Sequence, residues 1–352
     1  MTTPLGCARV PEVGVPEAAW LPRGTAGTAL GMALGGTQYA GSMSQPVPSR
    51  REQAAVLALA RRTPKGWHLL AQAVERAGTA LPLAAGEWPD DAPREILGVA
   101  TATLDSSLAA EAELDELEEM ISTLATAGIS LVTILDGAYP SNLRLVYDRP
   151  PFLFVRGDLQ ADDSMSIAVV GTRKASVAGL DQAARIARGL AERGVTVISG
   201  LALGIDGAAH RATLEAKGRT IAVVGHGLKT PIYPKQHAGL AEAIVEAGGA
   251  VVSQFLPDTP PRPERFPMRN RTMSGLALGT VVIEASNTSG ARMQARVALE
   301  HGKRVFLVRG LVTREPWARA YSDHPGVTVV DDAVEVLEVI HQLPDGYELT
   351  LS

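Results

Sequence analysis

The 352-residue chain contains one cysteine, Cys7, few aromatic residues and no long apolar run. A single cysteine excludes a disulfide framework and any cysteine-rich metal site. Aromatic residues make up only 4%, so a core must consist mainly of Ala, Val, Leu and Ile side chains. No segment approaches the roughly 18 apolar residues that span a membrane, so we expect a cytoplasmic protein with no membrane partner. Hydrophobic residues nevertheless reach 46%, which excludes wholesale disorder.

Two nucleotide-binding motifs are also missing. A dinucleotide site needs G-x-G-x-x-G at a strand-to-helix turn, but the next glycine after Gly171 is Gly179, and the Gly-His-Gly run at 225–227 lacks the third glycine. The P-loop pattern G-x-x-x-x-G-K-[ST] does not occur. We therefore expect no dinucleotide and no P-loop ATPase activity.

Asp206 and His210 are four residues apart and would share one face of a helix. A third ligand and an H-E-x-x-H pattern are both missing, so metal binding is disfavoured. Asp206 is better explained as a cap or first-turn acid, and His210 as a hydrogen-bonded structural histidine. The sequence predicts no metal, no cofactor and no catalytic residue.

The first third of the chain divides into two parts. Residues 1–48 are rich in Gly, Pro, Ser and Thr without a clear period, which predicts a disordered leader. Residues 49–127 show helical spacing and predict a small helical domain. Its elements would be two short helices within 50–77, a loop at 81–98 and a third helix at 111–127, whose acidic face we interpret as solvated.

Between residues 128 and 342 short β-branched runs alternate with amphipathic segments. This pattern is typical of an α/β domain with a mainly parallel sheet covered by helices on both faces. Residues 343–352 would form a tail. In such sheets ligands bind at the carboxyl ends of the strands, so the residues that follow each strand become the candidates for function. The predicted strands are at 130–135, 152–156, 167–170, 196–199, 220–224, 250–253, 280–284, 304–308 and 327–330.

Four of these strand ends present glycines and hydroxyl groups. Glycine lets the backbone approach a ligand closely, and the start of the following helix offers free N–H groups and partial positive charge. Arg173 can grip a phosphate with two hydrogen bonds. The strand ends therefore predict an anion-binding rim. The residues concerned are Gly171, Thr172, Arg173 and Lys174; Ser199, Gly200 and Gly204; Gly225 and Gly227; and Ser289 and Gly290.

Residues 260–271, PPRPERFPMRNR, hold four arginines against one acid, Glu264. One interpretation is a proline-stiffened loop with solvated charges. The alternative is a clamp for several phosphates beside the rim, because this loop leaves the preceding strand at the same edge. Phe266 can stack on a base, although a single Phe between prolines is more often a packing anchor.

The net charge of −5 is an average over unlike parts. Residues 1–163 hold 12 basic and 20 acidic residues, a net of −8, and residues 313–352 hold 2 and 8, a net of −6. Residues 164–312 hold 19 and 10, a net of +9. The basic middle coincides with the rim and the arginine run, so the overall acidity does not exclude nucleic acid.

Seven stretches, in order and in register over about 164–310, resemble the DprA/Smf family (DNA-processing protein A). They are Gly171-Thr172-Arg173, SGLALGID with Ala209-His210, TIAVVGHG, Tyr233-Pro234, FPMRNR with Gly275-Leu276, Glu284-Ala285, and Ser289-Gly290.

The resemblance implies an extended Rossmann-like domain over 128–342 that binds single-stranded DNA without sequence preference. It further implies DNA processing in natural transformation and recombination, help in loading a RecA-type recombinase, a homodimer and no enzymatic activity. Arg269, Asn270 and Arg271 would line the DNA-phosphate site together with the rim residues.

The chain also departs from the family pattern. Gln254 replaces the usual Glu, the run 291–294 (Ala-Arg-Met-Gln) replaces the common Ser-Leu-x-Thr, Arg309-Gly310 replaces Pro-Gly, and 313–325 is dissimilar. The chain ends soon after its last strand and helix, which leaves no room for a C-terminal winged helix.

Two alternatives stay open. A DprA-like regulator or antitoxin in phage defence would explain the departures. A nucleotide-binding sensor or enzyme could use the same rim, with Glu284 as its acid.

Overall fold

The structure is a computed structural model that describes residues 48–63, 66–88 and 107–342. All of them belong to one structural unit, Ser44–Ser352. Within these residues no helix is both long and apolar enough to cross a membrane. The predicted leader (apart from Pro48), the tail and most of the predicted loop at 81–98 lie outside the described residues.

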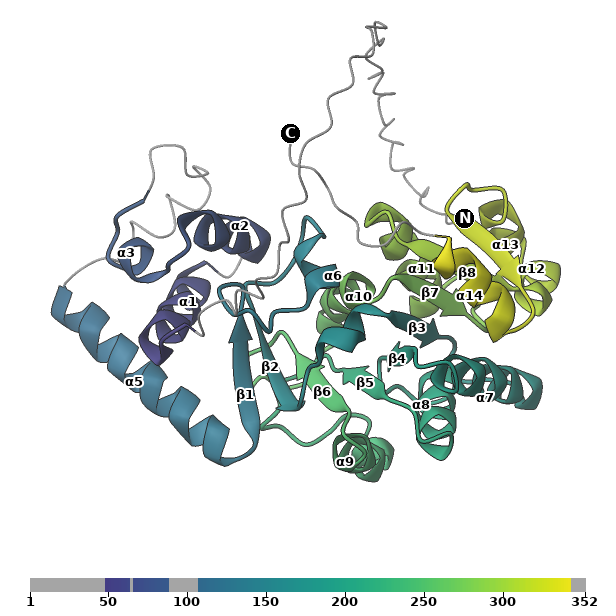
Figure 1. Ribbon diagram of the computed structural model, residues 1–352, viewed down its shortest axis with the longest axis horizontal. Helices are drawn as coiled ribbons and strands as arrows, with labels where there is room; N and C mark the ends of the chain where they lie inside the picture. The colour runs from purple at the N-terminus through teal and green to yellow at the C-terminus, as the bar shows by residue number, and fades with distance from the viewer. Residues whose placement is uncertain (1–47, 64–65, 89–106, 343–352) are drawn as a thin grey trace, which may run out of the picture. The chain divides into compact units, whose positions relative to one another are not determined.

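The described residues contain one nine-stranded sheet with the order β1-β2-β6-β5-β4-β3-β7-β8-β9 (Figure 1). The strands from β6 to β9 in this order pair in parallel, whereas β1-β2 and β2-β6 are antiparallel. The mainly parallel α/β fold is confirmed. The bounds are β1 Ile129–Thr133, β2 Phe152–Gly157, β3 Ser166–Val170, β4 Thr196–Ser199, β5 Thr220–Val223, β6 Ala250–Ser253, β7 Gly279–Val282, β8 Arg304–Val308 and β9 Val327–Val330.

Helices connect the parallel strands and form two groups. One group, α7, α8, α9 and α14, packs together, and α10 contacts α11 and α6 in the other. Both faces of the central strands are therefore covered, which explains why β3 to β7 are buried along their whole length. The bounds are α6 Ser141–Arg144, η2 Ala161–Ser164, α7 Val177–Ala191, α8 Ile205–Glu215, η3 Lys235–His237, α9 Ala238–Glu246, α10 Arg265–Leu276, α11 Gly290–Glu300, α12 Arg309–Arg314, α13 Pro316–Tyr321 and α14 Ala333–His341.

The chain reverses its direction of travel across the sheet between β3 and β7. From β3 it moves outward through β4 and β5 to β6, and then returns to form β7 on the other side of β3. From β7 it moves the opposite way to β8 and β9. The connections after β3 and β7 therefore diverge, which opens a crevice at the carboxyl ends of these two strands.

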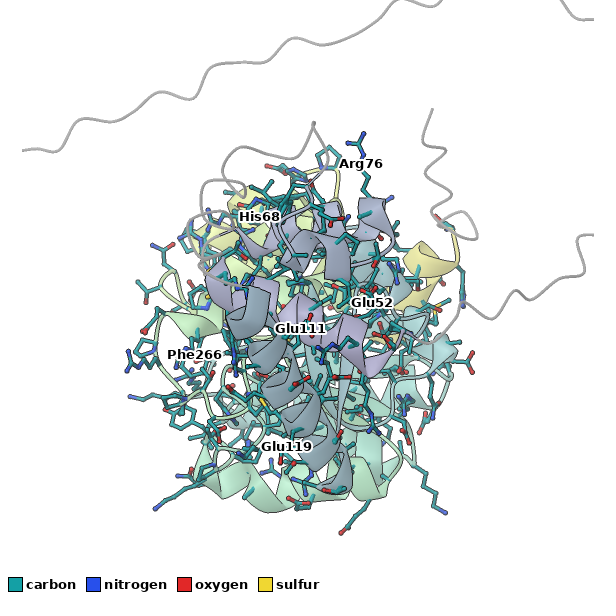
Figure 2. The ribbon with its side chains drawn as sticks, turned by 90° about the vertical axis from the view of Figure 1, so that its left-hand side faces the viewer. Glu52, His68, Arg76, Glu111, Glu119 and Phe266 are labelled. Atoms are coloured by element: carbon teal, nitrogen blue, oxygen red, sulfur yellow. The ribbon has the colours of Figure 1, made fainter. Side chains whose placement is uncertain are left out.

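Within the described residues, four helices precede the sheet: α1 Arg50–Arg62, α2 Trp67–Ala77, α3 Leu81–Ala84 and α5 Ser107–Thr126. The Ser49 hydroxyl caps α1 by accepting a hydrogen bond from the Glu52 N–H, 3.2 Å away. α5 packs on both α1 and β1, and Figure 2 looks onto this helix, with Glu111 and Glu119 labelled. The predicted helices are confirmed, while the division into domains at 127/128 stays a prediction.

Two predicted elements were wrong. Residues 81–84 are helical, not loop. The arginine run at 260–271 is not a loop throughout, because α10 begins within it, at Arg265. Pro267 is tolerated there because the first turn of a helix needs no N–H donor. The helix fixes which arginines share a face.

Candidate functional site

A cavity of about 370 Å³ lies in the crevice at the ends of β3 and β7, and we call it the rim cavity. The loop after β3, one face of α10 and the start of α11 form its walls. Eight of the fourteen predicted site residues line it, which are Gly171, Thr172, Arg173, Lys174, Arg269, Asn270, Ser289 and Gly290. Residues more than 100 positions apart in the sequence, such as Gly171 and Gly290, therefore lie around one cavity.

The loop after β3 is held by backbone contacts that require glycine. A Cβ on Gly171 would lie 2.4 Å from Ile205 Cγ1. The Thr172 N–H donates to the carbonyl of Glu284 at 2.7 Å. Gly204 has φ 79°, and a Cβ there would lie 2.3 Å from the Thr172 carbonyl oxygen. The two glycines let the loops after β3 and β4 pack directly on each other.

Arg269 forms the floor of the rim cavity, and its side chain is buried. Its guanidinium occupies the space where a side chain of residue 200 would be, since a Cβ on Gly200 would lie 1.4 Å from Arg269 Nη1. Among the described residues, the guanidinium makes one hydrogen bond, from Nη1 to the Met273 sulfur at 3.6 Å, and its Nε has no partner. The guanidinium therefore has unused donors next to the cavity.

The buried carboxylate of Asp206 lies near Arg269, and backbone N–H groups already donate hydrogen bonds to it. It accepts hydrogen bonds from the Gly200 N–H at 3.1 Å and the Ala202 N–H at 3.4 Å. Burial raises the pKa of Asp206, against the opposing effect of Arg269 and the amides. Burial likewise lowers the pKa of Arg269, against the attraction of Asp206. Arginine stays protonated in proteins, so the cavity floor carries positive charge.

The mouth of the cavity combines cations with aromatic rings. Arg173 and Lys174 are exposed, and the Arg173 guanidinium lies over the Phe266 ring, 5.2 Å from its centroid. The rings of Phe266 and Tyr233 are 5.9 Å apart. A smaller cavity of about 40 Å³ lies between them, lined also by Gly200 and Leu203. The guanidinium of Arg173 and the rings of Phe266 and Tyr233 thus lie next to each other at the cavity mouth, so a ligand there can meet both a charged group and an apolar surface.

The opposite wall is the start of α11. The Ser289 hydroxyl caps this helix by accepting from the Ala291 N–H at 3.2 Å. The Asn270 Nδ2 donates to the carbonyl of Gly290 at 3.4 Å, which ties α10 to α11. The helix start adds partial positive charge to the cavity.

Gln294 also lines the rim cavity, and we did not predict it from the sequence. Its side chain is buried, yet neither Oε1 nor Nε2 has a hydrogen-bond partner among the described residues. A buried amide without a partner is costly, so a ligand that bonds it would recover free energy. The only sequence signal was the departure from the family pattern at 291–294.

Six predicted residues lie outside the rim cavity. The Ser199 hydroxyl donates to the Val169 carbonyl at 2.6 Å inside the sheet. Gly225 packs against Phe266, and Gly227 against the backbone of residues 256 and 257. Arg271, on another face of α10, pairs with Asp148 and with Glu300. Gly200 and Gly204 act beside the cavity, as described above.

The candidate acid of the nucleotide-enzyme alternative, Glu284, is engaged outside the rim cavity. The Glu284 carboxylate accepts from the Ser176 N–H at 2.9 Å and from the Ser176 hydroxyl at 2.6 Å. It also pairs with Arg314 and does not line the rim cavity.

His210 Nδ1 lies 2.7 Å from the Thr220 hydroxyl, and burial lowers the His210 pKa to about 3. No group of three or more metal-ligating side chains is found in the described part of the chain.

A family model described as DNA recombination-mediator protein A matches residues 130–324. Protein Smf of Escherichia coli K12 is 44% identical over 220 residues, which cover 60% of this chain and 57% of that protein. DNA processing protein DprA of Bacillus subtilis 168 is 36% identical over 196 residues, covering 55% of this chain and 65% of that protein. The chain thus matches less than two thirds of the length of these two relatives.

Among solved structures, DNA processing protein A from Streptococcus pneumoniae superimposes with a TM-score of 0.62 at 29% identity, covering 83% of this chain and 98% of that one. A structure titled as showing the single-stranded DNA binding mode of DNA processing protein A from Helicobacter pylori gives a TM-score of 0.54 at 23% identity, covering 60% and 95%. At that identity the second likeness speaks for the fold alone.

Proposed function

Because the chain belongs to the DNA recombination-mediator protein A family, we propose that it binds single-stranded DNA at the rim cavity and serves in DNA processing during recombination and natural transformation. The observation that carries the proposal is the buried Arg269 guanidinium over Gly200 at the cavity floor. A buried cation with unused donors is a costly arrangement that an incoming anion stabilises.

Phosphate groups fit the polar side of the cavity. Arg269, Arg173 and Lys174 supply positive charge, and the start of α11 adds oriented N–H groups. None of these groups recognises a particular base, so binding is sequence-tolerant and falls with salt.

The apolar side fits bases. Phe266 and Tyr233 form an aromatic pair at the mouth, and Leu203 and Tyr233 are exposed there. Base–aromatic stacking requires bases that are not already stacked in a duplex, which favours a single strand over double-stranded DNA.

Further parts of the proposal come from family membership. They are a RecA-type recombinase as partner, self-association into a dimer, a cytoplasmic location and a binding role without catalysis. Their support is family membership and the name of the Bacillus subtilis relative, DNA processing protein DprA.

The test is a titration of the full chain with a labelled dT oligomer of about 20 nucleotides, a duplex of the same length and a mononucleotide, each at several salt concentrations. We expect the single strand to bind most tightly, and Arg269→Gln to weaken it by one to two orders of magnitude, since a charge-assisted contact is lost. If Arg269→Gln does not fold, Arg173→Ala replaces it, because Arg173 is exposed.

The matched control is Arg193→Ala, an exposed arginine that lies outside the rim cavity and whose one hydrogen-bond partner in the described part of the chain is the Gly189 carbonyl. Equal binding of the mononucleotide and the oligomer would contradict the proposed ligand. Unchanged affinity in both Arg269→Gln and Arg173→Ala would contradict the proposed site.

A further inference from the structure

A second cavity, also of about 370 Å³, opens at the same edge of the sheet. Its walls are the first half of α7, the ends of β7 and β8, and α12. Glu284 connects it to the rim cavity, because its side chain lines the second cavity while its carbonyl holds the Thr172 N–H of the rim loop. Since β3, β7 and β8 are neighbours in the sheet, the two cavities follow each other along the strand ends.

Three arginines line the second cavity: Arg185 from α7, and Arg309 and Arg314 from α12. All three are exposed. Two carboxylates, Glu284 and Asp331, also face it. Arg309 stands where the family usually has proline.

The two carboxylates do not neutralise all the positive charge of the three arginines. Glu284 is shared between Ser176 and Arg314, whose Nη2 is 3.2 Å from Glu284 Oε1. Asp331 pairs with Arg309 at 2.7 Å. Arg185 bonds the side-chain oxygen of Gln182, and no carboxylate of the described residues is within ion-pair distance of it. The Arg309–Asp331 pair is exposed and therefore weak, and the Arg314 end of the other pair is exposed as well, so a phosphate can bind these arginines in place of the carboxylates.

We propose that the second cavity is a phosphate-binding subsite for the backbone of a strand that continues out of the rim cavity. The inference rests on the proposed function, since it needs a strand in the rim cavity. Three guanidinium groups at one cavity suit consecutive phosphodiesters, which they can bind with paired hydrogen bonds. The subsite would lengthen the contacted strand without recognising its bases.

The test compares two dT oligomers, of about six and about 20 nucleotides, because single-strand binding folds contact roughly 4–16 nucleotides. The full chain is compared with a double variant, Arg309→Ala with Arg314→Ala, by fluorescence anisotropy at several salt concentrations. We expect the double variant to bind the longer oligomer on the order of tenfold more weakly and the shorter one unchanged. The slope of the logarithm of its binding constant against the logarithm of salt concentration should become shallower by about 0.7 for each phosphate contact that is lost.

Two further variants complete the design. Arg193→Ala with Arg296→Ala removes two exposed arginines outside both cavities and should change neither oligomer's affinity. Asp331→Asn removes a competing carboxylate and should tighten binding of the longer oligomer.

If the longer oligomer binds the Arg309→Ala, Arg314→Ala variant as tightly as the unaltered chain, the subsite is overturned while single-strand binding stands. If the unaltered chain binds neither oligomer, the proposed function fails as well. An equal loss for both oligomers would also overturn the subsite, because the rim cavity itself would then be affected.

Discussion

On α1, Arg51 forms ion pairs with three carboxylates of α5, whereas on α10 Arg269 has no ion pair among the described residues and lies buried at the floor of the rim cavity. The first arrangement satisfies the charge on the surface of a helix pair. The second leaves charge and donors available beside a cavity. Two arginines of the same chain thus differ in partners and burial through placement alone, and counts of charge along the sequence do not reveal this difference.

The same contrast applies to buried amides. Gln53 on α1 donates from Nε2 to the Leu131 carbonyl at 3.1 Å and lies 3.3 Å from Asp136 Oδ1. Gln294 at the rim cavity has no partner for either polar atom in the described part of the chain. The Gln53 amide is satisfied inside the protein, while the Gln294 amide lies at the rim cavity with polar atoms that a ligand can satisfy.

The largest effect is expected for Gly200→Ala, which tests whether Arg269 must occupy its place. The new Cβ would overlap the guanidinium, and because that group is the end of a flexible side chain, it would move while the fold remains. We expect single-stranded DNA binding to weaken by about one to two orders of magnitude, measured by anisotropy. Gly239→Ala, with nothing within 4 Å of its Cβ, is the control. Retained affinity in Gly200→Ala would mean that Arg269 does not contact the strand.

A smaller effect separates the two arginine environments directly. Arg173→Ala should weaken the binding of single-stranded DNA by roughly tenfold, because one phosphate contact is lost. For the same reason, the slope of the logarithm of the binding constant against the logarithm of salt concentration should become shallower by about 0.7. Arg51→Ala should leave both quantities unchanged and instead lower the melting temperature slightly, because three exposed ion pairs are removed. An equal change in the salt dependence of DNA binding in the two variants would show that Arg173 and Arg51 do not differ in their contact with the strand.

The smallest effect concerns the two amides and has opposite signs. Gln294→Met should raise the free energy of unfolding by about 1 kcal/mol, because a buried amide without partners is replaced by an apolar side chain. Gln53→Met should lower it by about 1–2 kcal/mol, because buried acceptors lose their donor. Both are measured by denaturant unfolding. A loss of stability in Gln294→Met would show that its amide is already satisfied in the folded protein.

Much of the fold was predictable because the strands are short, apolar and separated by helical spacing. The antiparallel pairing of β1 and β2 was not, since it depends on contacts with β6 rather than on local pattern. The rim residues after β3 and before α11 were predicted correctly as neighbours, because parallel strands end at a common edge.

The arginine run marks the limit of the sequence argument. Its prolines indicated a loop, in which Arg269 and Arg271 would be equivalent. The helix places Arg269 at the cavity floor and Arg271 beside Asp148 on another face. The burial of Arg269 and the unpartnered amide of Gln294 depend on packing between α10, α11 and the sheet, which no local pattern encodes.

The reversal of chain direction between β3 and β7 has a consequence for synthesis on the ribosome. The rim cavity needs Gly171 from one side of the reversal and Gly290 from the other, with four further strands, β4 to β7, between them in the sequence. A nascent chain that has completed β3 to β6 holds a glycine-lined edge but no second wall. The rim cavity would then be complete only once α11 has emerged from the ribosome.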